Sequence, residues 1–225
     1  MTSLTKRAGQ SALWQISGGA GQTIIRLGAS VVLARALTPQ DFGIYGMALL
    51  FKEFVMRIGN LGMGAGIIAR KETTEDDLCT CFWTMTGLRV CLFILTFATA
   101  PFASNFFNNP ELTTVVRVIS LTFLFSIPSV VANFLLSKDL RYQEINIVRS
   151  LGALFESGFA VTLVTTTNLD YWALVFAMLS TVLLTETTIG LLAKWYPKFR
   201  FSKLSFNYLF YFGINQLGNG LIVYL

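Results

Sequence analysis

The sequence predicts an all-α integral membrane protein, and three properties of the 225-residue chain lead to that prediction. Hydrophobic residues make up 54% of the chain and charged residues only 13%, about half the charged fraction of a soluble domain. The mean hydropathy is +0.62. Apolar runs of roughly 20 residues, long enough to span a bilayer, recur without the alternation typical of a β-barrel. Because backbone polar groups in lipid must be paired within their own segment, these runs are expected to be helices.

About six to seven transmembrane helices are expected, joined by short turns. The seventh apolar segment continues to the end of the chain, which suggests a chain that stops within a span. The predicted spans are residues 11–35, 42–68, 78–103, 112–136, 145–167 and 171–193, with the seventh starting near residue 206.

Helix-start signals stand in three of the turns. Thr38 and Asn109 each precede a proline and an acidic residue, the order expected of an N-cap followed by the first helical turn. Thr74 precedes three acidic residues, which are interpreted as a first turn facing the helix dipole rather than as a metal site. Pro128 falls inside the fourth span and should kink it.

The loop charges predict the orientation in the membrane. Cytoplasmic loops are enriched in lysine and arginine, and one set of segment ends holds ten such residues against Arg35 alone in the other set. The N-terminus is therefore expected in the cytoplasm. The ten residues are Lys6, Arg7, Arg70, Lys71, Lys138, Arg141, Lys194, Lys198, Arg200 and Lys203.

Composition argues against several other classes. The net charge of +5 is spread over the loops, so a nucleic-acid partner is not expected. The chain has no histidine, and Cys79, Cys81 and Cys91 lie in one predicted helix, so neither a metal nor another cofactor is predicted. The loops are too short to form a catalytic domain, so the chain is not predicted to be an enzyme.

Charged residues at membrane depth are the candidate functional residues. The segment "FKEFVMR" places Lys52, Glu53 and Arg57 in the middle of the second span. Three charges facing lipid would cost roughly 8–10 kcal/mol, so they are expected to face protein or a water-filled cavity. The other predicted cavity cations are Arg26, Arg89 and Arg149, and the other predicted pairing or ion-coupling carboxylates are Glu156 and Glu186.

Helical spacing leaves two interpretations open. Glu53 and Arg57 are four residues apart and share a helix face, so they are expected to pair, either as an interhelical clasp or in a cavity wall. Arg149 is near a predicted helix end, where its side chain could instead extend to the interface. Counted together, the interior cations outnumber the carboxylates of the first five spans. A cavity with surplus positive charge would attract an anion.

The order of these features resembles the polysaccharide transporter family of the multidrug/oligosaccharidyl-lipid/polysaccharide exporter superfamily, which includes O-antigen and exopolysaccharide flippases. The similar segments are "VVLARALTPQDFGIYGMALL", "IGNLGMGAGIIARKE", "CFWTMTGLRV", "FFNNPEL", "SKDLRYQEI" and "YFGINQLGNGLIVYL". The resemblance implies a two-lobe transporter, in which residues 1–200 would form the N-terminal six-helix lobe and residues 201–225 would begin the second.

The resemblance also implies a function. Flippases of this family move oligosaccharides linked to undecaprenyl pyrophosphate across the bacterial cytoplasmic (inner) membrane by alternating access, which implies that membrane as the location of this chain. The implied partners are that lipid-linked oligosaccharide, membrane lipids, and the polysaccharide polymerase and chain-length machinery. The pyrophosphate would bind to the cavity cations, for which arginine is well suited. The alternative is an ion-coupled drug or small-molecule antiporter of the same superfamily, which would need interior carboxylates.

Overall fold

The computed structural model describes residues 21–25, 27–58, 63–70 and 72–223, and every regular element within these ranges is a helix. Residues 21–25 and 27–36 are helical and precede α2. The predicted all-helical fold is thereby confirmed for this part of the chain. The elements that follow are α2 (Pro39–Ile58), α3 (Met63–Ala69), α4 (Glu75–Phe106), α5 (Leu112–Phe125), the short 3-10 helix η1 (Ile127–Ser129), α6 (Ala132–Lys138), α7 (Tyr142–Thr166), α8 (Tyr171–Leu192) and α9 (Lys203–Val223).

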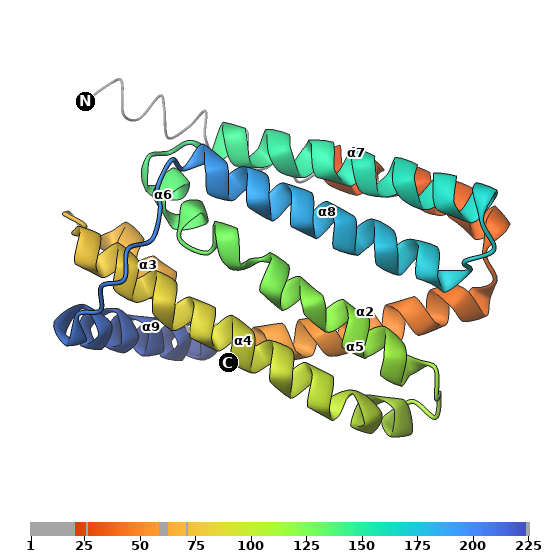
Figure 1. Ribbon diagram of the computed structural model, residues 1–225, viewed down its shortest axis with the longest axis horizontal. Coiled ribbons are helices and arrows are strands. Elements are labelled where there is room, and N and C mark those ends of the chain that lie inside the picture. The colour runs from red at the N-terminus through yellow and green to blue at the C-terminus, as the bar shows by residue number, and fades with distance from the viewer. Residues whose placement is uncertain (1–20, 26, 59–62, 71, 224–225) are drawn as a thin grey trace.

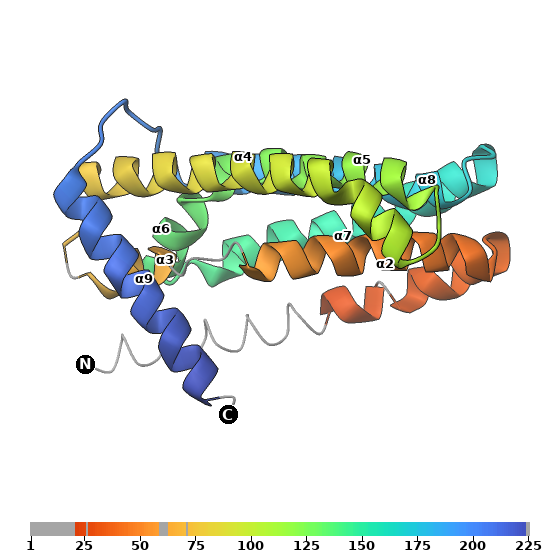
Figure 2. The ribbon, with the colours of Figure 1, turned by 90° about the horizontal axis from the view of Figure 1, so that it is seen from below.

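The long helices lie side by side in two layers (Figures 1 and 2). In Figure 2, α4, α5 and α8 form one layer, and α2 and α7 lie in the other. α4 packs along α5, α7 packs along α8, and α2 contacts both α5 and α8. A buried cluster of small and branched side chains joins α2, α5 and α8 at the centre of the bundle, including Ile44, Ala48, Val115, Ile119 and Val175.

Four helical segments in the described residues are long and apolar enough to cross a membrane: Glu75–Phe106, Leu112–Ser129, Tyr142–Thr166 and Tyr171–Leu192. They coincide with four of the predicted spans. α2 and α9 are long enough, but the charged residues of α2 and the asparagines of α9 make these helices more polar. The first predicted span lies largely outside the described residues.

The predicted caps at Thr38 and Thr74 are confirmed. The Thr38 hydroxyl oxygen accepts the backbone N–H of Asp41 at 3.3 Å, and the Thr38 backbone N–H donates to the Asp41 carboxylate at 2.8 Å. Thr74 forms a reciprocal capping box with Asp77 at the start of α4. The helix expected at Pro110 begins two residues later than predicted, because residues 110–111 form a turn in which the Asn109 side chain accepts the backbone N–H of Glu111 at 3.1 Å.

The predicted kink at Pro128 is a full interruption of the helix. α5 ends at Phe125, η1 makes a single tight turn, and α6 starts at Ala132. A proline removes one backbone donor and clashes with the preceding turn, which explains why the helix cannot continue. The interruption lies against α8, where the backbone of Pro128 faces Gly190.

α9 crosses one end of the bundle and slants away from it in Figure 2. Its beginning is fixed to α4. The Thr80 hydroxyl accepts the backbone N–H of Ser202 at 2.9 Å, and the Trp83 indole donates to the carbonyl oxygen of Lys198 at 3.0 Å. α9 also packs closely on α3, because a Cβ atom at Gly66 would lie only 3.1 Å from a methyl group of Leu209.

Candidate functional site

A cavity of about 340 Å³ lies between α2, α7 and α8, with Gln22 contributing from the helical residues that precede α2. Five of the eight sequence-predicted site residues line it. Depth in the membrane had been the main reason for selecting them, and the three helices place them around one space. These five residues are Lys52, Glu53, Arg149, Glu156 and Glu186.

Helical periodicity explains how α2 and α7 contribute to the cavity. On α2, Tyr45, Leu49 and Lys52 follow one another at spacings of four and three, so they lie on one face. On α7, Arg149 and Glu156 are seven residues apart and therefore share a face. Each helix directs a charged residue into the cavity while its other faces pack against neighbours or remain exposed.

Lys52 and Glu53 form an ion pair, with Lys52 Nζ 2.9 Å from Glu53 Oε1. The expected pair between Glu53 and Arg57 is therefore wrong. Consecutive residues point about 100° apart on a helix, but the long lysine stem brings its ammonium group back to the neighbouring carboxylate. Arg57 is exposed and has no ion pair with any described residue.

A chain of hydrogen bonds runs from Arg149 to Glu186 through the interrupted segment around Pro128. Arg149 Nη2 donates to the Asn133 side-chain oxygen at 3.2 Å, and Asn133 Nδ2 donates to the backbone oxygen of Ser129 at 3.0 Å. The Ser129 hydroxyl then donates to the Glu186 carboxylate. The helix interruption therefore supplies the groups that hold one cavity cation and one cavity carboxylate in place.

Two of the remaining predicted cations, Arg57 and Arg89, do not line this cavity. Arg89, on α4, donates to the sulfur atom of Met56 at 2.7 Å and lies within electrostatic range of Glu186. Arg57 is exposed at the end of α2. Arg26 lies outside the described residues.

The charge balance of the cavity differs from the expectation. Among the described residues, two cations line it, Lys52 and Arg149, against the carboxylates of Glu53, Glu156 and Glu186. The expected surplus of positive charge is therefore not found among the described residues that line this cavity. The expectation included every cation at membrane depth, and some of these cations lie on helix faces that do not line this cavity.

Sequence reasoning missed the uncharged polar residues of the cavity. Tyr45 on α2 and the two threonines Thr181 and Thr185 on α8 line the same space. A signal was present, since Tyr45 is seven residues before Lys52 and the two threonines are four apart. Within the described ranges, no group of three or more cysteine, aspartate and glutamate side chains is arranged to hold a metal ion.

Four apolar helical segments of membrane length, two of which line a cavity with charged side chains, define the chain as a multi-pass membrane protein. Comparison with known proteins then identifies the family. The chain belongs to the polysaccharide biosynthesis protein family, whose model matches residues 32–225. The family resemblance inferred from the sequence is confirmed, and the family is one of transporters rather than of enzymes.

Three curated relatives are similar to the chain. The teichuronic acid biosynthesis protein TuaB of Bacillus subtilis is 27% identical over 99% of this chain and 46% of its own length. The lipopolysaccharide biosynthesis protein WzxC of Escherichia coli is 26% identical over 68% of this chain and 31% of its own length. The succinoglycan biosynthesis transport protein ExoT of Rhizobium meliloti is 21% identical over 84% of this chain and 38% of its own length. The chain thus matches less than half the length of each relative. No solved structure matches it.

Proposed function

We propose that this chain is part of an exporter that moves oligosaccharides linked to undecaprenyl pyrophosphate across the bacterial cytoplasmic membrane during polysaccharide biosynthesis. The observation that carries the proposal is the cavity of about 340 Å³ between membrane-length helices, lined by charged side chains. A glycan pyrophosphate needs a polar path through lipid, and a cavity of this kind provides one. The family and the three relatives, each named for polysaccharide biosynthesis, support the same class of substrate.

The proposed domain organisation follows the resemblance. Residues 1–200 form the first lobe, and residues 201–225 begin the second, which moves against the first to give alternating access. The N-terminus lies in the cytoplasm, as the loop charges favour. In the cell, the exporter would pass its cargo to the polymerase and chain-length machinery.

Lys52 and Arg149 are the proposed contacts of the pyrophosphate. Both line the cavity, and each is held by a neighbour, Lys52 by Glu53 and Arg149 by Asn133. When the anion arrives, it competes with these neutral or acidic partners for the two cations. Arg89 has a different role, which is to compensate the charge of Glu186 from outside the cavity.

The test is export by the full-length protein in liposomes that contain a labelled undecaprenyl-pyrophosphate oligosaccharide, followed by its accessibility to an external glycosidase. Lys52→Met and Arg149→Met should each weaken substrate binding roughly ten- to hundredfold, because a hydrogen bond to a charged group contributes about 1.5–3 kcal/mol. Lys194→Met, at an exposed position just beyond the end of α8, is the matched control. Export that stays at the wild-type level in both cavity variants would contradict the proposed contacts.

An ion-coupled antiporter for drugs or other small molecules is the second candidate, and one observation favours it. The cavity carboxylates Glu53, Glu156 and Glu186 outnumber the cavity cations, as expected of a site that exchanges protons or sodium for a cationic substrate. Proton flux driven by a cationic drug, absent in Glu186→Gln and accompanied by no glycan export, would favour the antiporter. Glycan export that needs a proton or sodium gradient would instead assign these carboxylates to coupling within the proposed exporter.

A further inference from the structure

Basic and large apolar side chains alternate in residues 194–204, the segment between α8 and the first turn of α9, which we call the basic linker. The sequence after Glu186 contains no aspartate or glutamate. α8 is a helix of membrane length that ends at Leu192, so the basic linker begins where that helix leaves the bilayer. The exposed cations of the basic linker are Lys194, Lys198, Arg200 and Lys203.

The apolar side chains of the basic linker are exposed as well. Four of them are between 61% and 93% exposed: Tyr196, Phe199, Phe201 and Leu204. A group of large apolar side chains on a protein surface usually marks a site of contact with another molecule or with a membrane. Aromatic side chains are enriched at the membrane–water interface, where they lie at the level of the lipid head groups. The composition and position of the basic linker are therefore those of a segment in contact with head groups.

α4 holds the basic linker in one conformation. The Thr80 hydroxyl accepts the backbone N–H of Ser202 at 2.9 Å, and the Trp83 indole donates to the carbonyl oxygen of Lys198 at 3.0 Å. The Trp83 ring also stacks on the Phe199 ring, with 4.7 Å between their centroids. A ligand that binds a segment already held in place does not have to order it, which favours binding.

Other cations at the same end of the bundle (Figure 1) are held by close protein partners. Lys138, in the last turn of α6, donates to the carbonyl oxygen of Arg70 at 2.8 Å. Arg141, just before α7, donates twice to the Glu144 carboxylate, at 2.7 and 2.6 Å. The charges of Lys138 and Arg141 are therefore used within the protein.

Two cations of the basic linker have only loose partners. Lys198 Nζ lies 3.5 Å from a carboxylate oxygen of Glu75, and Arg200 Nη1 lies 3.7 Å from one of Asp76. Both distances exceed those of ordinary hydrogen bonds between these groups. The Lys198 and Arg200 side chains are 62% and 61% exposed, and exposed ion pairs contribute little to stability. A phosphate can therefore compete with the two carboxylates.

We propose that the basic linker binds the head group of an anionic phospholipid of the surrounding bilayer. The lipid phosphate lies between Lys198 and Arg200 in place of Glu75 and Asp76, and the exposed apolar side chains contact the upper part of the acyl chains. Arginine suits this role because it can donate two parallel hydrogen bonds to a phosphate. Basic segments next to membrane spans attract anionic lipids. Such binding needs only the bilayer, so it does not depend on the proposed function.

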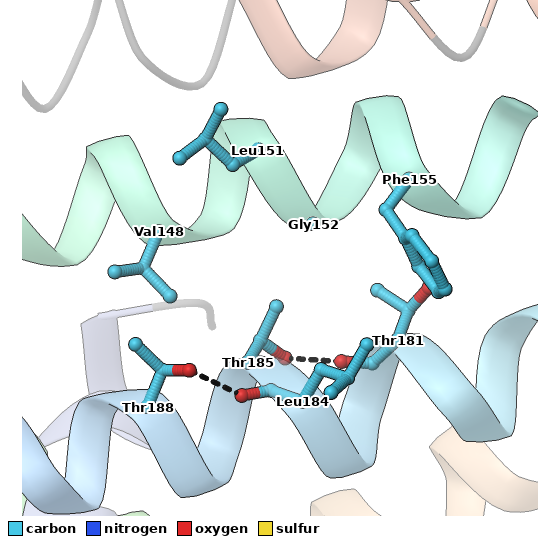
Figure 3. A pocket seen from close by; sticks show the side chains of 8 residues that line it. All are labelled: Val148, Leu151, Gly152, Phe155, Thr181, Leu184, Thr185 and Thr188. Carbon is cyan, nitrogen blue, oxygen red and sulfur yellow. Dashed lines mark hydrogen bonds between the residues drawn. The ribbon is translucent and has the colours of Figure 1, made fainter.

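The groove of about 220 Å³ between α7 and α8 is a lipid-facing surface of a different kind (Figure 3). None of the described residues that line it is charged. The hydroxyls of Thr185 and Thr188 each donate to a carbonyl oxygen one turn earlier on α8, both at 2.7 Å, so their protons are used within the helix. This groove offers contacts to the acyl chains of any phospholipid. It therefore provides a control surface with no preference for anionic lipid.

The experiment places the photoreactive amino acid p-benzoylphenylalanine at position 199 of the full-length protein, in liposomes with equal amounts of phosphatidylglycerol and phosphatidylcholine in both leaflets. After illumination, mass spectrometry identifies the attached lipid. The ratio of attached phosphatidylglycerol to phosphatidylcholine should be at least about fivefold higher than at two control positions, because one basic residue near an anionic surface contributes about that factor. The controls are Phe106, an exposed aromatic residue at the other end of α4, and Leu184 in the groove.

Charge variants test whether the two cations cause the preference. Lys198→Gln combined with Arg200→Gln should lower the ratio at position 199 by about fivefold or more. Lys198→Arg combined with Arg200→Lys keeps both charges and should keep the ratio. Glu75→Gln combined with Asp76→Asn removes the competing carboxylates and should raise it. Equal ratios at positions 199, 106 and 184 would overturn the inference, and so would a ratio at position 199 that is the same with and without the two charges.

Discussion

Gly190 on α8 allows the helix to approach the backbone of the interrupted segment. A Cβ atom at this position would lie 2.8 Å from the carbonyl oxygen of Pro128 and 3.1 Å from its carbonyl carbon. These are backbone atoms, which cannot rotate away as the end of a flexible side chain can. Gly190→Ala should therefore push α8 and η1 apart.

The destabilisation caused by the added methyl group can be separated from the stabilisation that alanine brings through its helix propensity. Alanine is favoured over glycine within a helix by about 1 kcal/mol, and overpacking of a well-packed contact costs about 1–3 kcal/mol. Gly158→Ala on α7 is the matched control, because nothing lies within 4 Å of its added Cβ atom. Both variants gain the same propensity, so Gly190→Ala should be less stable than Gly158→Ala by about 1–3 kcal/mol.

The assay is unfolding of the full-length protein in detergent, by heat and by a denaturing detergent, with the two variants side by side. Export should also fall in Gly190→Ala, because the displaced turn holds Ser129, whose hydroxyl donates to Glu186. Equal stability of the two alanine variants would refute the reasoning, because the separation of α8 and η1 would then not depend on the missing side chain.

Two further substitutions test the polar contacts that support the fold and the cavity. Asp77→Asn removes the carboxylate charge that pairs with Arg70, whose Nη1 atom lies 2.6 Å from Asp77 Oδ1. Because the Arg70 side chain is 30% exposed, the free energy of unfolding should fall by about 1–3 kcal/mol, less than the roughly 3–5 kcal/mol lost when a fully buried pair is broken. An unfolding midpoint equal to that of the wild type would show that the pair contributes nothing to stability. Ser129→Ala removes the hydroxyl that donates to Glu186 and should lower export. Ser129→Thr keeps a hydroxyl and should retain export. Equal export by the two variants would argue against a role for this hydrogen bond.

The helices and their starts could be predicted because their causes are local. Hydropathy over about 20 residues depends on neighbouring positions only, and the caps at Thr38 and Thr74 involve side chains three residues away. The late start of α5 was missed because the Asn109 side chain forms a short turn of its own instead of capping a helix. Asparagine can bond to nearby backbone groups in either way, and the sequence does not distinguish the two.

The cavity could be predicted in part, for a physical reason that has a clear limit. Charges at membrane depth must avoid lipid, and this requirement selected Lys52, Arg149 and Glu186, which the structure places around one cavity. It does not say which interior space a charge faces. Arg89 satisfies the same requirement by contacting Met56 on α2, so the balance of charge in the cavity depended on packing that only the structure provides.

The attachment of α9 to α4 has a consequence for the order in which the chain folds during synthesis. The hydrogen bond between Thr80 and Ser202 joins residues 122 positions apart. A ribosome adds about 5–20 residues per second, so roughly 6–24 s pass between the synthesis of the two partners. During that interval the faces of α3 and α4 that α9 covers have no intramolecular partner. A membrane insertase or chaperone that shields these faces would be needed for only that time, and its release would coincide with the arrival of α9.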